Sequence, residues 1–332
     1  MDRLRPELVA LARAGHDVIL AEDLRRLRFD SAERAAAVRL LHPLRRGAYA
    51  LVAPQDDENR HLLTLRAALR QADSSAAASH ISAALAHGLP VPAGTLATVH
   101  MCTDSPTTRV GLRHGVHTHA RSGSATLTMV EGLPVTDVAT TVFDCARMLP
   151  FVDAVALLDT ALNRELLDQA GVIDNWAKAP GLPGIATARR VAAVADAGAG
   201  SVGETRMRLI LVQAGFEVES QVELLDKRGR FVARVDLKLR DAPVVVEFDG
   251  RAKYNLRGDP EAAHWEDKIR HDRIGNLGYE RVRVWWNRLA DPASIVRDVE
   301  QARDRTRKGR KPQSGADSRQ AQASAPEPTD HA

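Results

Sequence analysis

The stretch Val244-Val245-Val246-Glu247-Phe248-Asp249-Gly250 (244–250) decides the fold of the C-terminal part of this chain. Its continuous apolar run is typical of a β-strand that is buried on both faces, as in an α/β sheet. Glu247 and Asp249 stand two residues apart at its end, so they project from the same face of the strand. Two like charges at the end of a buried strand are costly unless a cation or a proton neutralises them.

A third carboxylate, Asp236, lies on the preceding predicted strand, residues 231–239, whose odd-numbered side chains are apolar and predict one buried face. If the two strands pair, Asp236 joins Glu247 and Asp249. Three carboxylates together suit Mg²⁺ or Mn²⁺, which can activate water and stabilise charge on a phosphate under attack. The alternative for Asp236 is a place on a solvated strand face.

The flanking segments predict the order helix, three strands, helix, strand. Ser201 and Glu204 open a helix with a capping-box pattern, and residues 216–224 alternate as the first strand. A second helix is predicted from residue 259 to about 277, and residues 279–286 alternate as the last strand.

This order resembles the core of the PD-(D/E)XK nuclease superfamily, and more closely the proteins related to very-short-patch-repair endonucleases. The resemblance covers about residues 200–290. It rests on these residues: Glu204, Asp236, Glu247-Phe248-Asp249-Gly250, Asp272-Arg273 and Gly278-Tyr279. It implies a Mg²⁺- or Mn²⁺-dependent DNA endonuclease, in which Asp236 and Glu247 hold the metal. Asp249 would add a direct or water-mediated contact, and Glu204 would orient water or a second ion.

The chain departs from this superfamily at the signature lysine, whose position Asp249 occupies. That lysine places the attacking water and offsets charge in the transition state. Lys268 on the following helix is the first substitute, and Lys253 just past the strand end is the second. The plain alternatives are that Glu204 only caps its helix, that Lys268 only pairs with a neighbouring acid, and that the fold is an inactive binding module.

The first 55 residues predict three helices and a basic hairpin, the order of a winged helix-turn-helix. The third predicted helix, residues 32–41 with Ser31 as N-cap, carries Arg34 and Arg39, and the hairpin carries Arg45 and Arg46. In such a module the helix enters the major groove and the hairpin contacts phosphates, so these four arginines are the predicted DNA contacts. The alternative is a small domain that only packs against its neighbour.

The segment from about residue 8 to 170 resembles AbiEi-type antitoxins of type IV toxin–antitoxin systems. The resemblance rests on the hairpin ending in Ala50, on Ser79-His80-Ile81-Ser82-Ala83-Ala84 with the Gly88-Leu89-Pro90 turn, and on Glu131-Gly132-Leu133-Pro134-Val135-Thr136. This chain lacks the arginine that the family often has before the next helix, and Ala139-Thr140-Thr141 stands at that place. The resemblance implies a repressor of its own operon and a nucleotidyltransferase toxin as partner.

Composition and charge limit these hypotheses. The 332 residues carry a net charge of +3, and residues 301–332 account for all of it, so residues 1–300 are neutral overall. DNA binding would therefore depend on local patches. No apolar run approaches a membrane span, and two cysteines exclude a disulfide framework, so we expect a cytoplasmic protein without membrane contact.

Three histidines, His114, His117 and His119, lie close together in the middle of the chain. His117 and His119 alternate on one face of a predicted strand, which could suit a metal, but no cysteine or acid stands near them. The sequence therefore favours a solvated strand face.

We therefore expect a multi-domain α/β protein with a winged helix-turn-helix at 1–55, an antitoxin-like α/β domain at 56–195, a restriction-endonuclease-like domain at 200–300 and a disordered tail at 301–332. The leading hypothesis is a DNA-binding protein with a Mg²⁺-dependent nuclease-like domain. The second hypothesis is a non-catalytic transcriptional repressor of antitoxin type.

Overall fold

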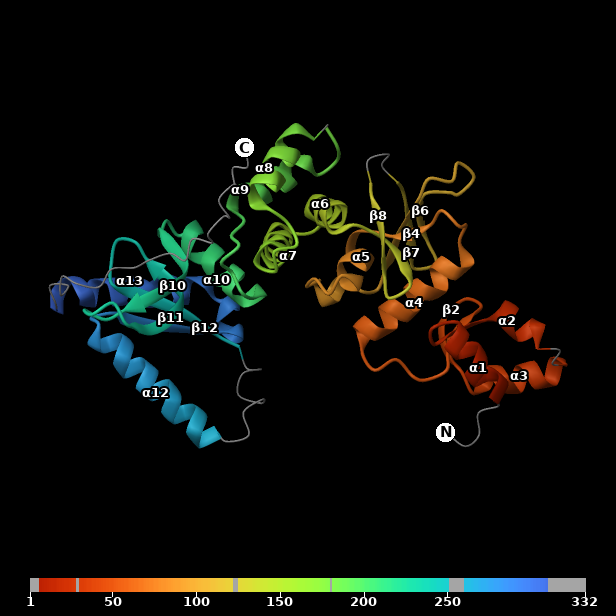
Figure 1. The fold of residues 1–332 in the computed structure, drawn as a ribbon, viewed down its shortest axis with the longest axis horizontal. Helices are drawn as coiled ribbons and strands as arrows, with labels where there is room; N and C mark the ends of the chain where they lie inside the picture. The colour runs from red at the N-terminus through yellow and green to blue at the C-terminus, as the bar shows by residue number, and fades with distance from the viewer. Residues whose placement is uncertain (1–5, 28–29, 122–124, 180, 251–259, 310–332) are drawn as a thin grey trace, which may run out of the picture. The chain divides into compact units, whose positions relative to one another are not determined.

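The structure, a computed structural model, describes residues 6–27, 30–121, 125–179, 181–250 and 260–309. It is a mixed α/β, multi-domain protein with two compact units, Met1–Ala195 and Asp196–Ala332 (Figure 1). Helix α9 (Ile185–Val194) stands between two loops, at 181–184 and 195–201.

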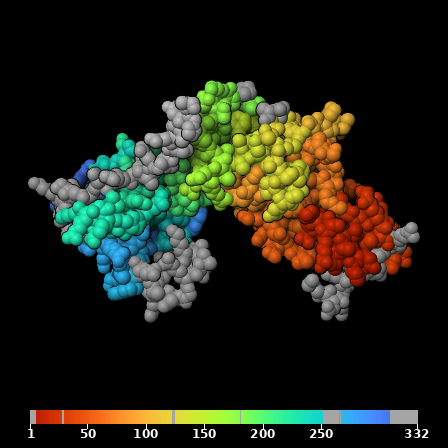
Figure 2. Space-filling view, viewed as in Figure 1, coloured from red at the N-terminus to blue at the C-terminus, as the bar shows by residue number. Residues whose placement is uncertain are grey.

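The first fifty residues form three helices and a small antiparallel sheet. Its strands stand in the order β1-β3-β2, and the described residues of this segment lie together in the red part of Figure 2. The elements are α1 (Pro6–Ala14), β1 (Val18–Leu20), α2 (Ala21–Arg26), α3 (Ser31–Arg39), β2 (His42–Arg45) and β3 (Ala48–Ala50). Leu8, Ile19 and Leu24 lie in their shared core.

Helix α3 begins one residue earlier than predicted and ends two residues earlier. Asp30, not Ser31, is its N-cap, because the Asp30 side chain accepts from the Glu33 backbone N–H and Glu33 accepts from that of Asp30. This reciprocal capping box satisfies two backbone donors at the helix start. The predicted Ser31 cap was therefore wrong by one position.

The rest of the first unit is a six-stranded sheet with helices packed against it. Its strand order is β6-β7-β5-β4-β9-β8, and β5 and β7 are parallel. The strands are β4 (Ala77–Ala78), β5 (Val99–Thr103), β6 (Gly111–Arg113), β7 (Val116–Ala120), β8 (Leu127–Val130) and β9 (Leu133–Thr136). The helices are α4 (Asp57–Gln71), α5 (His80–Ala86), a 3-10 turn (Ala93–Thr95), α6 (Val138–Met148), α7 (Phe151–Asn163) and α8 (Gln169–Lys178).

Helix α4 joins this sheet to the first fifty residues. Arg70 of α4 donates two hydrogen bonds to the carboxylate of Asp23 and one to the carbonyl of Val18. Asp23 also accepts from the backbone N–H of Leu20, and it is only 6% exposed. The two segments that the sequence separates at residue 55 thus share a partly buried ion pair.

The second unit is a four-stranded sheet in the order β10-β11-β12-β13, antiparallel except for the parallel pair β12-β13. Its elements are α10 (Val202–Gln213), β10 (Val218–Leu225), β11 (Phe231–Leu239), β12 (Val244–Asp249), α12 (Pro260–Asn276), β13 (Glu280–Trp285), a 3-10 helix (Trp286–Ala290) and α13 (Pro292–Gly309). Met207 of α10 and Ile295 of α13 pack in the core on one face, and Ile274 of α12 packs on the other.

Strand β11 does not keep one apolar face along its length. Ala233 and Val235 pack with Ile274, whereas Leu237 and Leu239 pack with the opposite core. The change occurs where the neighbouring strand β10 contains Gln221, whose φ of 51° breaks the regular strand pleat. The predicted single face of 231–239 was therefore wrong, and Asp236 stands at the crossover.

The disordered tail predicted for 301–332 was wrong in its first residues, because they belong to a helix. Helix α13 continues to Gly309, and its Ala302 is fully buried in the core of the second unit. The remaining tail, 310–332, lies outside the described residues. No helix in the described parts of the chain is both long and apolar enough to cross a membrane.

Candidate functional site

The two carboxylates that end β12 are neutralised by arginines. Glu247 is 7% exposed, and its Oε1 accepts hydrogen bonds from Arg270 of α12, with the Nε at 3.1 Å. Its Oε2 accepts from the Nε of Arg281, whose side chain is only 5% exposed. Sequence reasoning requires a neutralising cation at this strand end, and guanidinium groups supply it.

These contacts belong to a longer chain of alternating charges, which we call the ion-pair ladder: Arg270, Glu247, Arg281, Asp267, Arg283 and Asp249. Arg281 Nη2 lies 2.9 Å from Asp267 Oδ1, and Arg283 Nη1 lies 2.7 Å from Asp267 Oδ2. Arg283 also pairs with Asp249. Burial raises the pKa of Asp267, but the hydrogen bond and charge of Arg281 and the charge of Arg283 outweigh this and hold the pKa below its usual value.

The ladder forms because three elements present charges to one face of the sheet. Glu247 and Asp249 share that face of β12 with Val245, and parallel pairing sets Glu247 beside Arg283 of β13. Helix α12 covers this face and adds Asp267 and Arg270. With three acids and three arginines, the ladder has no net charge, which makes partial burial tolerable.

Asp236 takes part in a different contact. Its Oδ2 accepts a hydrogen bond of 2.7 Å from the backbone N–H of Phe248, so it lies beside the end of β12 between the two acids of that strand. The Phe248 ring itself turns to the opposite face, where it packs against Gly203 of α10.

Glu204 caps helix α10, as the plain alternative predicts. Its carboxylate accepts from the Ser201 hydroxyl at 2.9 Å and from the Gly200 backbone N–H, while the Ser201 hydroxyl accepts from the Glu204 N–H. Glu204 also accepts a 3.0 Å hydrogen bond from the side-chain amide of Gln221, the residue at the kink of β10.

The two candidate lysines are not brought to these carboxylates by any described contact. Lys268 is exposed on α12, and its Nζ lies 5.3 Å from the centre of the Trp265 ring. Lys253 lies outside the described residues.

The predicted magnesium ligands do not form a ligand set as they stand. Among the described residues, three histidines bring their ligand atoms within 4.8 Å of one another, as a metal site requires. The carboxylates of Asp236, Glu247 and Asp249 do not form such a group in the part of the chain that the structure describes. Glu247 and Asp249 already have guanidinium partners, so these residues do not fit a magnesium ion in this arrangement.

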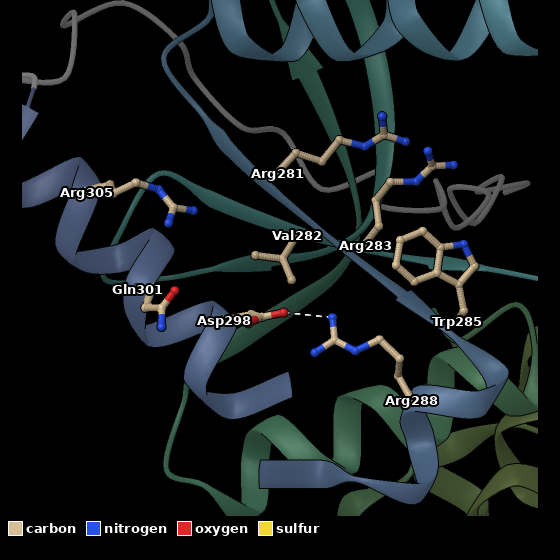
Figure 3. A pocket seen from close by; sticks show the side chains of 8 residues that line it. All are labelled: Arg281, Val282, Arg283, Trp285, Arg288, Asp298, Gln301 and Arg305. Atoms are coloured by element: carbon tan, nitrogen blue, oxygen red, sulfur yellow. Dashed lines mark hydrogen bonds and ion pairs between the residues drawn. The ribbon is translucent and has the colours of Figure 1, made fainter. Parts of the chain in front are cut away.

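A basic hollow of about 350 Å³ lies beside β13 and α13 (Figure 3). Four arginines line it together with an exposed tryptophan: Arg281, Arg283, Arg288, Arg305 and Trp285. Arg281 and Arg283 extend toward α12, whereas Arg288 extends toward α13, where it pairs with Asp298 at 2.7 Å. The sequence did not lead to a prediction of this surface, because only the alternation of polar and apolar residues in β13 entered the reasoning.

The predicted DNA contacts of the first unit are arranged unequally. Arg39 and Arg46 are exposed, and Arg34 is half-buried. Arg45 is held against α4, because its Nη1 donates to Gln71 Oε1 at 2.8 Å, and burial lowers its pKa. The exposed part of α3 consists otherwise of Ser31, Ala32, Ala35 and Ala36.

The three histidines of the middle segment separate in the structure. His114 stands exposed in the turn before β7 with φ 49°, whereas His117 and His119 are partly buried against His100 of β5. His80 of α5 stacks on His119 with ring centres 3.8 Å apart. The predicted solvated strand face was therefore wrong. His100 is the histidine that sequence reasoning did not include with His117 and His119. Its alternation with the apolar Val99 and Met101 was the signal that could have identified it.

Comparison with known proteins supplies a likeness but no activity. No family model matches this chain. Two curated proteins from two strains of Mycobacterium tuberculosis, each described only as an uncharacterized protein, are 29% identical to it over 212 residues. This match covers 62% of this chain and 75% of each relative.

Proposed function

We propose that this chain is a DNA-binding protein of the repressor type, in which the first fifty residues bind double-stranded DNA. The observation that carries the proposal is the exposed face of α3, where short side chains stand beside Arg39. Short side chains let a helix backbone approach base edges closely, and arginine is the side chain that most often reads guanine in the major groove.

The arrangement around α3 supports this proposal. Three helices and a hairpin, with strand order β1-β3-β2, support the proposal of a winged helix-turn-helix, in which the third helix would enter the major groove. The hairpin turn places Arg46 on the surface next to Gly47, whose φ of 71° forms the tight turn. Arg46 would contact a phosphate there.

Local charge supports it as well. Residues 1–50 contain ten arginines against seven acids, although residues 1–300 as a whole are neutral. Asp23 is paired with Arg70, so this acid does not offset the charge of Arg39. Arg45, held by Gln71, would position the hairpin and not contact DNA itself.

The test is fluorescence anisotropy with a labelled duplex taken from upstream of the chain's own gene. We expect the Arg39→Ala/Arg46→Ala double variant to bind at least tenfold more weakly, and each lost phosphate contact to lower the salt slope by about 0.9. Arg13→Ala, which removes an exposed arginine from α1, is the matched control. Equal affinity of the double variant and the control would refute the proposal.

A Mg²⁺-dependent endonuclease is the second candidate. It is favoured by the position of Asp236 at the end of β12 and by the exposed Trp285 beside the hollow, since an exposed aromatic ring can stack on the bases of a nucleic-acid strand. The ion-pair ladder counts against it, because Glu247 and Asp249 would have to exchange their arginines for a metal.

This candidate has its own test, cleavage of plasmid and single-stranded DNA in Mg²⁺, in Mn²⁺ and in chelator. Metal-dependent cutting that is lost in Asp236→Asn and kept in Glu280→Gln would establish the enzyme. Absence of cutting under all three conditions would count against the nuclease and leave the repressor as the supported function. A nucleotidyltransferase toxin as partner, and a cytoplasmic location, stay predictions of the resemblance.

A further inference from the structure

We propose that His100, His117 and His119 bind a divalent transition-metal ion, with Zn²⁺ as the ion that suits them best. One ring nitrogen from each of the three histidines lies within 4.8 Å of the others. The site is on the six-stranded sheet of the first unit, and it does not depend on the proposed DNA binding.

Sheet geometry brings the three side chains together. Strands β5 and β7 are parallel neighbours, with His100 paired in register with His117 and Cys102 with His119. Residues two apart on a strand share a face, so all three histidines lie on one side. Val99, Met101 and Val116 point to the other side, into the core under α4. The arrangement is thus fixed by the same alternation that builds the core.

The separation of the nitrogens is close to that of metal ligands. His100 Nδ1 lies 2.9 Å from His119 Nε2. Two Zn–N bonds of 2.0–2.1 Å at the tetrahedral angle would place their nitrogens about 3.3 Å apart. The rings of His117 and His119 stack with centres 4.1 Å apart, so His117 must turn its ring to direct a nitrogen at the same point.

The backbone of His100 is held firmly for this role. Its N–H donates to the Ser82 hydroxyl at 2.7 Å. The Ser82 hydroxyl in turn donates to His61 Nε2, because His61 Nδ1 must donate its proton to the Leu96 carbonyl at 2.8 Å. This chain of buried hydrogen bonds fixes β5 against α4 and α5, and it leaves the His100 ring free to face His119.

A second layer surrounds the three histidines. His80 lies over His119, and its Nδ1 is 3.8 Å from Asp144 Oδ2, while Asp144 Oδ1 pairs with Arg147 at 2.6 Å. His80 has a φ of 51°, a conformation that is uncommon among residues other than glycine. Because the His80 ring stacks on that of His119, we assign His80 a positioning role, and Asp144 reaches the site only through His80.

The ligand set selects the class of metal. Three imidazoles with no carboxylate among them suit Zn²⁺, Ni²⁺, Co²⁺ or Cu²⁺, whereas Mg²⁺ and Ca²⁺ prefer oxygen. Cys102 shares this face of β5 with His100, but the group whose ligand atoms lie within 4.8 Å of one another consists of the three histidines.

The experiment titrates Zn²⁺ into the untagged, chelator-treated full-length chain by calorimetry and follows the unfolding temperature. We expect one ion per chain, a rise in the unfolding temperature, and a loss of at least tenfold in affinity in His119→Gln and in His117→Gln. His114→Gln, which changes the exposed histidine of the neighbouring turn, should bind as the unmodified chain does.

Two outcomes would overturn the proposal. The first is the absence of stoichiometric Zn²⁺ binding by the unmodified chain. The second is equal affinity in His119→Gln, His117→Gln and His114→Gln, which would assign the ion to surface histidines. If His119→Gln loses its circular dichroism signal and does not fold, the partly exposed His117 decides the result through its own variant.

Discussion

Replacement of Glu247 by glutamine separates the two accounts of the strand end, because they predict opposite signs. The glutamine keeps the shape of the side chain and removes its charge. Arg281, whose side chain is 5% exposed, and Arg270 then lose the carboxylate that neutralises them. If Glu247 were instead one of three unneutralised carboxylates awaiting a metal, removing its charge in chelator would relieve repulsion and stabilise the chain.

The magnitude follows from burial. Breaking a buried ion pair by removing one partner costs about 3–5 kcal/mol. Arg281 keeps Asp267 at 2.9 Å, and the Arg270 side chain is 39% exposed and can turn to water, so we expect the lower end, about 3 kcal/mol. The free energy of unfolding of the second unit should fall by this amount.

The assay is urea unfolding in chelator at neutral pH, followed by tryptophan fluorescence. Three of the four tryptophans, Trp265, Trp285 and Trp286, lie in the second unit and report its unfolding. Glu280→Gln is the matched control, because its ion pair with Arg305 is exposed on both sides and should change stability by no more than about 1 kcal/mol. An unchanged or increased stability of Glu247→Gln would refute the ion-pair ladder as the reason for burying these acids.

Two further predictions concern packing and pH. A Cβ at Gly203 would lie 2.1 Å from the Phe248 ring, so Gly203→Ala should lower the free energy of unfolding of the second unit by about 1–3 kcal/mol in the same urea assay, and an unchanged midpoint would contradict the packing of α10 on β12. Burial lowers the pKa of His80, His100 and His119 to about 3 from 6.5, so the unfolded chain binds protons between these values that the native chain does not. The free energy of unfolding of the first unit should therefore fall as pH drops below about 6.5. Urea unfolding followed by circular dichroism measures this dependence, and His119→Gln should make the free energy depend less steeply on pH between 6.5 and 5. An identical slope in the variant would contradict the burial of this ring.

The second unit shows how far local sequence patterns reach. Strict alternation and apolar runs are sufficient to predict β11 with its observed bounds, and to predict that Glu247 and Asp249 share a face. The arginines that neutralise them come from α12 and β13, more than twenty residues away. No spacing rule identifies such partners, because they are set by how the helix packs on the sheet.

The histidines show the same limit in the first unit. Alternation predicts that His117 and His119 share a face, and this is how β7 presents them. His100 joins them only because β5 and β7 pair in parallel across a connection through β6, a nonlocal choice that the sequence leaves open. His80 arrives from a helix, with a backbone conformation that its residue type does not predict.

The central claim is that the first fifty residues read a DNA sequence, and one comparison tests it most directly. The full-length chain is titrated at 0.15 M salt into the duplex from upstream of its own gene and into a scrambled duplex of the same composition. The account predicts a preference of about a thousandfold or more for the natural duplex, which is largely lost in Arg39→Ala. Equal affinity for both duplexes, unchanged in Arg39→Ala, would contradict it.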